Sequence, residues 1–172
     1  PIDEKGKPFR NIVYEYTLAK ALADGLYVKN PTIAKRKNFD VKGKSAEEIE
    51  QVKLEDAISI HQQTKTDLEL YSLNNNQKLV KPFILVVCKD ITHAKAVYDH
   101  IYSSTFYEGQ YIGKVLQYDS STKKDEEVFE FFVSLEDYDN PIEIVIHVGM
   151  LKEGWDVSNL FTIVPLRAAN AG

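Results

Sequence analysis

Four short apolar runs in the second half of the chain constrain its fold most strongly. They are PFILVVC at 82–88, KVLQY at 114–118, IEIVIHV at 142–148 and FTIVPL at 161–166. Continuous apolar runs of this length are typical of strands that are buried on both faces of a sheet. The segments between the first three runs have helical periodicity, with Ala94, Val97 and Ile101 on one face and Val128, Phe131, Phe132 and Leu135 on another. This alternation predicts an α/β fold with a parallel sheet flanked by helices.

The first half of the chain is expected to be mostly helical. Thr17 and Gly25 are suited to cap and end one short helix. A long helix should begin at Ser45, because the sequence SAEE forms a capping box with Glu48, and it should end at Asn74–Asn76. About 29 residues at ~1.5 Å each would span on the order of 43 Å, so we expect this helix to break or to bridge two domains. Its apolar face is predicted to hold Ile49, Val52, Ala57, Ile60, Thr64, Leu68 and Tyr71.

Composition narrows the class of protein. The 172 residues carry a net charge of −5, which argues against a uniformly basic surface that coats nucleic acid. Residues 29–44 are locally basic, and this segment is either a solvated connection or a patch that meets phosphates. The single cysteine, Cys88, excludes an internal disulfide. No apolar run approaches the ~20 residues of a membrane span and no signal peptide opens the chain, so we expect a cytoplasmic protein without a membrane partner.

The stretch VGMLKEGWDVSN at 148–159 is the best candidate for chemistry. It follows the third apolar run, and ligands of parallel sheets bind beyond the carboxyl ends of the strands. Glycines allow the backbone to approach a ligand closely, Asp156 can accept hydrogen bonds from two neighbouring hydroxyls, and Lys152 with loop amides can hold a phosphate. A purely structural interpretation stays open, in which Gly154 makes a sharp turn, Trp155 is a buried plug and Asp156 caps a helical turn.

This stretch also resembles a known family. VGMLKEGWDVSNLFTIVPLR is similar to motif V of superfamily-two helicases, in the form found in the restriction (Res) subunits of type III restriction enzymes. PFILVVCKDITHAKAV resembles the motif IV strand and helix of that family. YEYTLAKALADGLYVKNP resembles the segment that follows the first motor domain. The resemblance covers most of the chain and is most specific at EGWDV.

The resemblance implies a RecA-like second motor domain. Residues 1–44 would be the tail of the first motor domain, 45–77 a connecting helix, and 78–172 the second RecA-like domain, cut before motif VI. Gly154 and Asp156 would bind the nucleotide. The residues implied to contact DNA are Thr92, which should also cap its helix, together with Ser120, Ser121, Met150, Leu151 and Lys152. The implied partners are double-stranded DNA, a methyltransferase (modification) subunit and the first RecA-like domain.

Two departures from the family pattern limit what the chain should do alone. It has neither the GxxxxGK[ST] phosphate loop nor a DEAD-like acidic box for magnesium, which belong to a first motor domain. We therefore expect a fragment of a larger protein that uses ATP and Mg²⁺, with no catalytic residue, cofactor or metal site in the fragment itself. The alternatives are a related superfamily-two helicase outside restriction and a non-enzymatic α/β binding module.

Overall fold

The structure is a computed structural model, and it describes residues 14–25, 31–118, 125–148 and 157–167. The chain divides into two compact units, one from Pro1 to Val41 and the other from Lys42 to Gly172. The first unit contains one described helix, α1 (Leu18–Asp24). As predicted, the Thr17 hydroxyl accepts a hydrogen bond from the Lys20 amide, and Gly25 ends the helix with a φ of 65°.

The second unit contains one sheet of four described strands, all parallel. Its elements are α2 (Ala46–Asn75), β1 (Phe83–Cys88), α3 (Ile91–Ile101), the 3₁₀ helix η1 (Phe106–Gly109), β2 (Val115–Tyr118), α4 (Asp125–Ser134), β3 (Ile144–Val148) and β4 (Leu160–Pro165). The strand order is β2-β3-β1-β4, and each neighbouring pair is parallel. The predicted α/β class and the four predicted strands are therefore confirmed, and the arrangement agrees with a RecA-like sheet.

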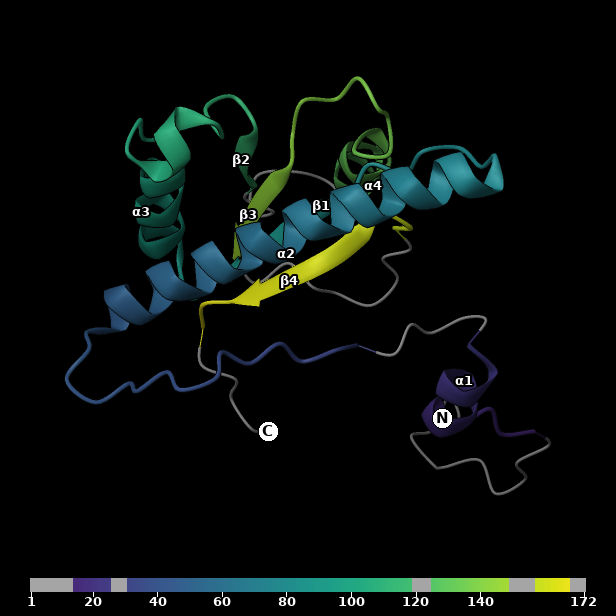
Figure 1. Cartoon of the computed structure of the whole chain (residues 1–172), viewed down its shortest axis with the longest axis horizontal. Helices are drawn as coiled ribbons and strands as arrows, with labels where there is room; N and C mark the ends of the chain where they lie inside the picture. Colours follow the sequence, from purple (N-terminus) through teal and green to yellow (C-terminus); the bar gives the residue numbers. More distant parts are fainter. Residues whose placement is uncertain (1–13, 26–30, 119–124, 149–156, 168–172) are drawn as a thin grey trace, which may run out of the picture. The chain divides into compact units, whose positions relative to one another are not determined.

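Helices cover both faces of this sheet. On one face α2 and α3 pack over β1, β3 and β4, and the buried cluster between them includes Ile58, Ala94, Val97, Ile146 and Val164 (Figure 1). On the other face α4 contributes Phe132 to a smaller cluster with Phe83, Leu85, Tyr118 and Val145. β1 lies between β3 and β4, and all six of its residues are buried, as expected for a strand covered on both faces.

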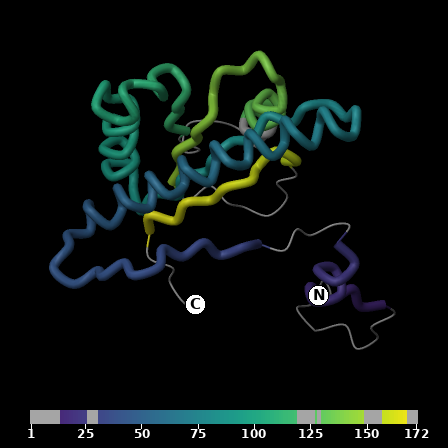
Figure 2. The backbone as a smooth tube through the Cα atoms, viewed as in Figure 1, coloured from purple at the N-terminus to yellow at the C-terminus, as the bar shows by residue number. Residues whose placement is uncertain are grey.

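Helix α2 is one continuous helix of 30 residues that lies along the sheet, against β4 and β1 (Figure 2). Its predicted capping box is present: the Glu48 amide donates to the Ser45 hydroxyl over 3.1 Å, and the Ser45 amide donates to the Glu48 carboxylate over 2.7 Å. The predicted apolar face was right at Ala57 and wrong at Ile60 and Tyr71. The buried residues are Leu54, Ala57, Ile58 and His61, whereas Ile60 and Tyr71 are exposed.

The predicted start of α3 also needs correction. Asp90, rather than Thr92, is the N-cap, because its carboxylate accepts a hydrogen bond from the His93 amide over 2.8 Å. Thr92 is an exposed residue in the first turn. The predicted apolar stripe of Ala94, Val97 and Ile101 is buried. Among the described residues, no helix combines the length and the hydrophobicity that crossing a bilayer requires.

Candidate functional site

The carboxyl ends of the four described strands lie along one edge of the sheet. Tyr118 of β2 is in register with His147 of β3, which is in register with Val87 of β1, and Val87 is in register with Pro165 of β4. The segments that leave these strands therefore start next to one another, as ligand binding at a parallel sheet requires. We call this side of the sheet the carboxyl edge.

A compact polar cluster occupies the carboxyl edge beside β1. Asp90 caps α3, and the ring of His93 in the first turn of that helix lies 2.9 Å from the Glu50 carboxylate through Nε2. The Lys89 amide donates to Nδ1 of the same ring over 3.4 Å. Because Glu50 comes from α2 and His93 is largely buried, this contact joins the beginning of α2 to the carboxyl edge of the sheet.

Burial keeps two of the side chains at this edge, Cys88 and His147, uncharged at neutral pH. Burial raises the pKa of the Cys88 thiol to about 12, and the nearby carboxylates of Glu50 and Asp90 act in the same direction. Burial lowers the pKa of His147 to about 4, and the positive charge of Arg167 adds to the shift. Cys88 is thus a buried, protonated thiol that packs as a small hydrophobic residue.

Most of the sequence-predicted site residues lie outside the described residues. This holds for the nucleotide contacts Gly154 and Asp156 and for the DNA contacts Ser120, Ser121, Met150, Leu151 and Lys152. The described strand residues next to them are Tyr118 and Val148, both at the carboxyl edge. Of the predicted set, only Thr92 is described, and its exposure at the start of α3 leaves it accessible from solvent.

The described chain resumes at Val157 near the amino end of β4. The Ser158 amide and hydroxyl both donate to the Glu136 carboxylate, over 3.1 and 2.7 Å. The buried Asn159 side chain donates to the carbonyls of Lys81 and Leu135. These bonds fix the entry to β4 beneath the end of α4, while the position of Asp156 stays a prediction.

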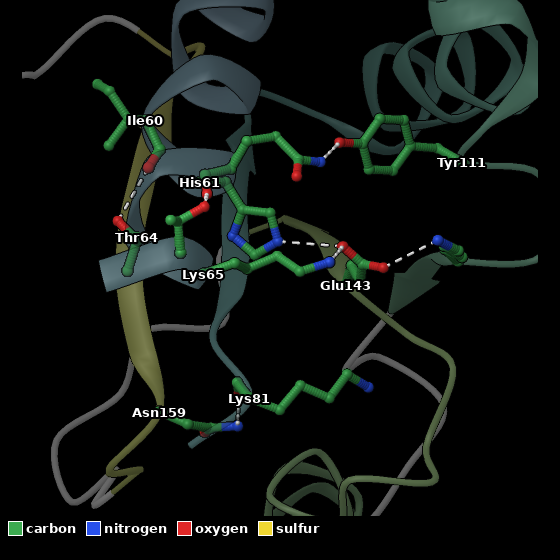
Figure 3. Close-up of polar contacts among 11 residues, drawn as sticks. Ile60, His61, Thr64, Lys65, Lys81, Tyr111, Glu143 and Asn159 are labelled. Atoms are coloured by element: carbon green, nitrogen blue, oxygen red, sulfur yellow. Dashed lines mark hydrogen bonds and ion pairs between the residues drawn. The ribbon is translucent and has the colours of Figure 1, made fainter. Parts of the chain in front are cut away.

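A second polar cluster, at the opposite or amino edge, was missed by the sequence analysis. Glu143 directly precedes β3 and is only 6% exposed. Its carboxylate lies 3.2 Å from Nε2 of His61, 3.1 Å from Nζ of Lys65 and 3.0 Å from Nζ of Lys114. Figure 3 shows the His61 ring and the Lys65 amino group directed at this carboxylate. Glu143 and Lys114 are far in sequence from His61 and Lys65, so no local motif indicates the cluster.

Electrostatics keep Glu143 ionised. Burial alone would raise the pKa of its carboxyl, but the hydrogen bonds from His61, Lys114 and Lys65 outweigh burial and hold the pKa well below its ordinary value. A carboxylate with three nitrogen partners is a stable buried anion, and it draws two lysine side chains together at the amino edge.

Within the described ranges, no group of three or more His, Cys, Asp or Glu side chains is arranged to hold a metal ion. Comparison of the chain with protein-family models, with curated proteins and with solved structures finds no match.

Proposed function

We propose that this chain is the second motor domain of an ATP-dependent translocase that acts on double-stranded DNA, of the kind found in the Res subunits of type III restriction enzymes. One observation carries the proposal: the helicase-like stretch VGMLKEGWDVSN begins at the last residue of β3 and follows the carboxyl end of a parallel sheet. In such sheets this end is where nucleotides and other ligands bind.

The proposal gives the chain half of an ATP site and not a complete one. Gly154 and Asp156 would contact the nucleotide, with Asp156 accepting hydrogen bonds from the ribose hydroxyls. The phosphate loop and the acidic residues for Mg²⁺ would come from a first RecA-like domain. Because phosphoryl transfer depends on those groups for positioning and for neutralising charge, we expect no ATP turnover by the 172-residue chain alone.

The proposed DNA contacts are expected to differ in strength. Lys152 would meet a backbone phosphate as a cation, supported by amides of its loop. A phosphate at Thr92 would lie near the carboxylate of Asp90, which caps the same helix, and like charges repel. We therefore expect Lys152 to contribute more than Thr92 to DNA affinity.

Asp156→Asn in the full-length translocase tests the proposal. Hydrogen bonds to a charged group contribute ~1.5–3 kcal/mol each, so loss of the charge should reduce DNA-stimulated kcat/KM for ATP by roughly 10- to 100-fold. Asp99→Asn is the matched control, because Asp99 is an exposed residue of α3 that pairs only with Lys95 among the described residues. Steady-state ATPase assays with and without duplex DNA measure the effect.

The result also separates the alternatives. A DNA-stimulated ATPase that is unchanged by Asp156→Asn would remove Asp156 from the nucleotide site. A full-length protein that contains this chain but neither binds nor hydrolyses ATP would replace the motor by a non-enzymatic binding module. Translocase activity without DNA cleavage would point to a superfamily-two helicase outside restriction.

A further inference from the structure

The amino edge of the sheet contains a pocket that the proposed motor function does not use. It has a volume of about 240 Å³. Its walls come from the second half of α2, the segment that leads into β1, the residue before β2 and the loop before β3. Its lining residues are Lys65, Glu69, Leu79, Val80, Lys81, Pro82, Lys114, Tyr138, Asp139, Asn140, Pro141 and Glu143. Because the strands are parallel, the pocket lies at the edge opposite the candidate nucleotide site.

Three lysines converge on this pocket, and two of them already have a partner. Lys65 and Lys114 share the Glu143 carboxylate, one on each oxygen. Their side chains are 31% and 36% exposed, so each ammonium keeps hydrogens that face water. A lysine ammonium has three donors, and one shared carboxylate leaves donors on both groups for another anion.

The third lysine, Lys81, is the unusual one. Its amino group is covered, and within the described part of the chain it has no hydrogen-bond partner. Figure 3 shows the Lys81 side chain extended below Glu143, with no contact drawn to its amino group. Burial lowers the pKa of Lys81, Glu143 opposes that shift, and Lys65 adds to it. A covered ammonium without an anion costs free energy, which binding of an anion would recover.

The acidic residues of the pocket do not serve as the anion that would pair with Lys81. Glu143 is taken up by His61, Lys65 and Lys114. Glu69 and Asp139 are exposed, so water screens their charges. The backbone of Lys81 is held in place, because Asn159 donates to its carbonyl oxygen over 3.0 Å. The site therefore combines a fixed backbone, a cation without a partner and two further cations at its wall.

We propose that the pocket at the amino edge binds a small phosphate-type oxyanion, with Lys81 as its principal ligand and Lys65 and Lys114 as supporting ligands. A dianion suits three converging ammonium groups better than a single carboxylate does, and lysine binds phosphate as a point charge. The volume of the pocket admits inorganic phosphate or a small organic phosphate. This assignment does not depend on the proposed motor function, which concerns the other edge of the sheet.

Titration of the 172-residue chain with inorganic phosphate, at constant ionic strength, tests the assignment by isothermal calorimetry. Lys81→Met should weaken the binding of phosphate at least 10-fold. Lys95→Met is the control, because Lys95 is a well exposed lysine of α3 outside the pocket, and it should leave the dissociation constant unchanged. A dissociation constant that is equal in wild type and Lys81→Met would overturn the proposal. So would no binding of phosphate to the wild type at about 10 mM, which is roughly tenfold above a weak dissociation constant of about 1 mM.

Thermal unfolding supplies a second readout, because the effect of Lys81→Met on the melting temperature should differ without and with phosphate. Without phosphate, Lys81→Met should melt at the same temperature as the wild type or higher, because it removes a covered charge. With phosphate, the wild type and Lys95→Met should gain melting temperature and Lys81→Met should gain less. An equal gain in melting temperature in all three proteins would indicate that phosphate stabilises them as an excluded salt, and it would contradict a site at Lys81.

Two further titrations identify the kind of phosphate compound that binds. Glycerol phosphate that binds more tightly than inorganic phosphate, with the same dependence on Lys81, would support a small organic phosphate as the natural ligand. A short DNA duplex that binds in a Lys81-dependent way, while inorganic phosphate does not bind, would overturn the small-ligand assignment in favour of a nucleic-acid contact.

Discussion

Glu143→Gln should lower the free energy of unfolding by about 2–3 kcal/mol at pH 7. The substitution keeps the shape of the side chain, and the amide oxygen can still accept from the buried His61. Two contacts lose the charge, those with Lys65 and Lys114. A hydrogen bond to a charged group contributes ~1.5–3 kcal/mol, and we take ~1 kcal/mol for each because the two ammonium groups are about one third exposed. Repulsion among the remaining lysines adds to the loss.

The dependence of this stability loss on pH is a more specific test of the ionised state of Glu143. The folded-state pKa of Glu143 lies below its ordinary value, so the unfolded state takes up the proton first as the pH falls. The contribution of Glu143 is therefore complete above about pH 4.3 and declines below it, by up to ~1.4 kcal/mol for each pH unit. The difference between wild type and Glu143→Gln should shrink to less than about 1 kcal/mol at pH 3.

Urea denaturation followed by far-UV circular dichroism measures both quantities. Glu69→Gln is the matched control, because Glu69 is an exposed carboxylate that lines the same pocket, and its loss should change stability by less than about 0.5 kcal/mol. A cost of Glu143→Gln below about 0.5 kcal/mol at pH 7, or an equal cost at pH 7 and pH 3, would refute the assignment of Glu143 as an ionised buried partner of the two lysines.

Two other predictions follow from burial and capping. Cys88 should react with a thiol reagent at pH 8 at least 100-fold more slowly in the folded chain than in urea, since its pKa is about 12 and its side chain is buried; equal rates would contradict this. Ser45→Ala should cost about 1 kcal/mol of unfolding free energy through loss of the capping box, whereas Ser59→Ala, at an exposed position inside α2, should cost nothing; equal effects of the two would show that the cap is not stabilising.

The strands were predictable because their signal is local and strong. Each apolar run is buried along most of its length, and the loss of periodicity in PFILVVC reflects helices on both faces of β1. The capping box of α2 was equally readable, since Ser45 and Glu48 are three residues apart. The order of the strands was not predictable, because it depends on contacts between elements that are distant in sequence.

The buried face of α2 and the cap of α3 show where local patterns fail. Apolar residues occur around much of α2, so spacing alone did not distinguish Ile58, which packs on the sheet, from the exposed Ile60. At α3, both Asp90 and Thr92 are good capping residues, and the end of β1 at Cys88 left Asp90 in the extended conformation that an N-cap adopts.

The two polar clusters were hidden for a related reason. Glu143 meets His61 and Lys65 across 82 and 78 residues, and Glu50 meets His93 across 43. Each residue alone is an ordinary surface type in sequence. Only the packing of α2 on the sheet brings them to buried partners, so no motif with fixed spacing could indicate them.

Helix α2 reaches from the carboxyl edge of the sheet to its amino edge. Glu50 near its start contacts His93 beside the end of β1, and Lys65 contacts Glu143 at the beginning of β3. Lys65 follows Glu50 by 15 positions, which correspond to about 22 Å of helix at ~1.5 Å per residue. Because an unbroken helix moves as one body, we expect a slide of α2 by about 1 Å, on the order of helix shifts in switching proteins, to alter both contacts. One element thereby positions side chains at both edges of the sheet.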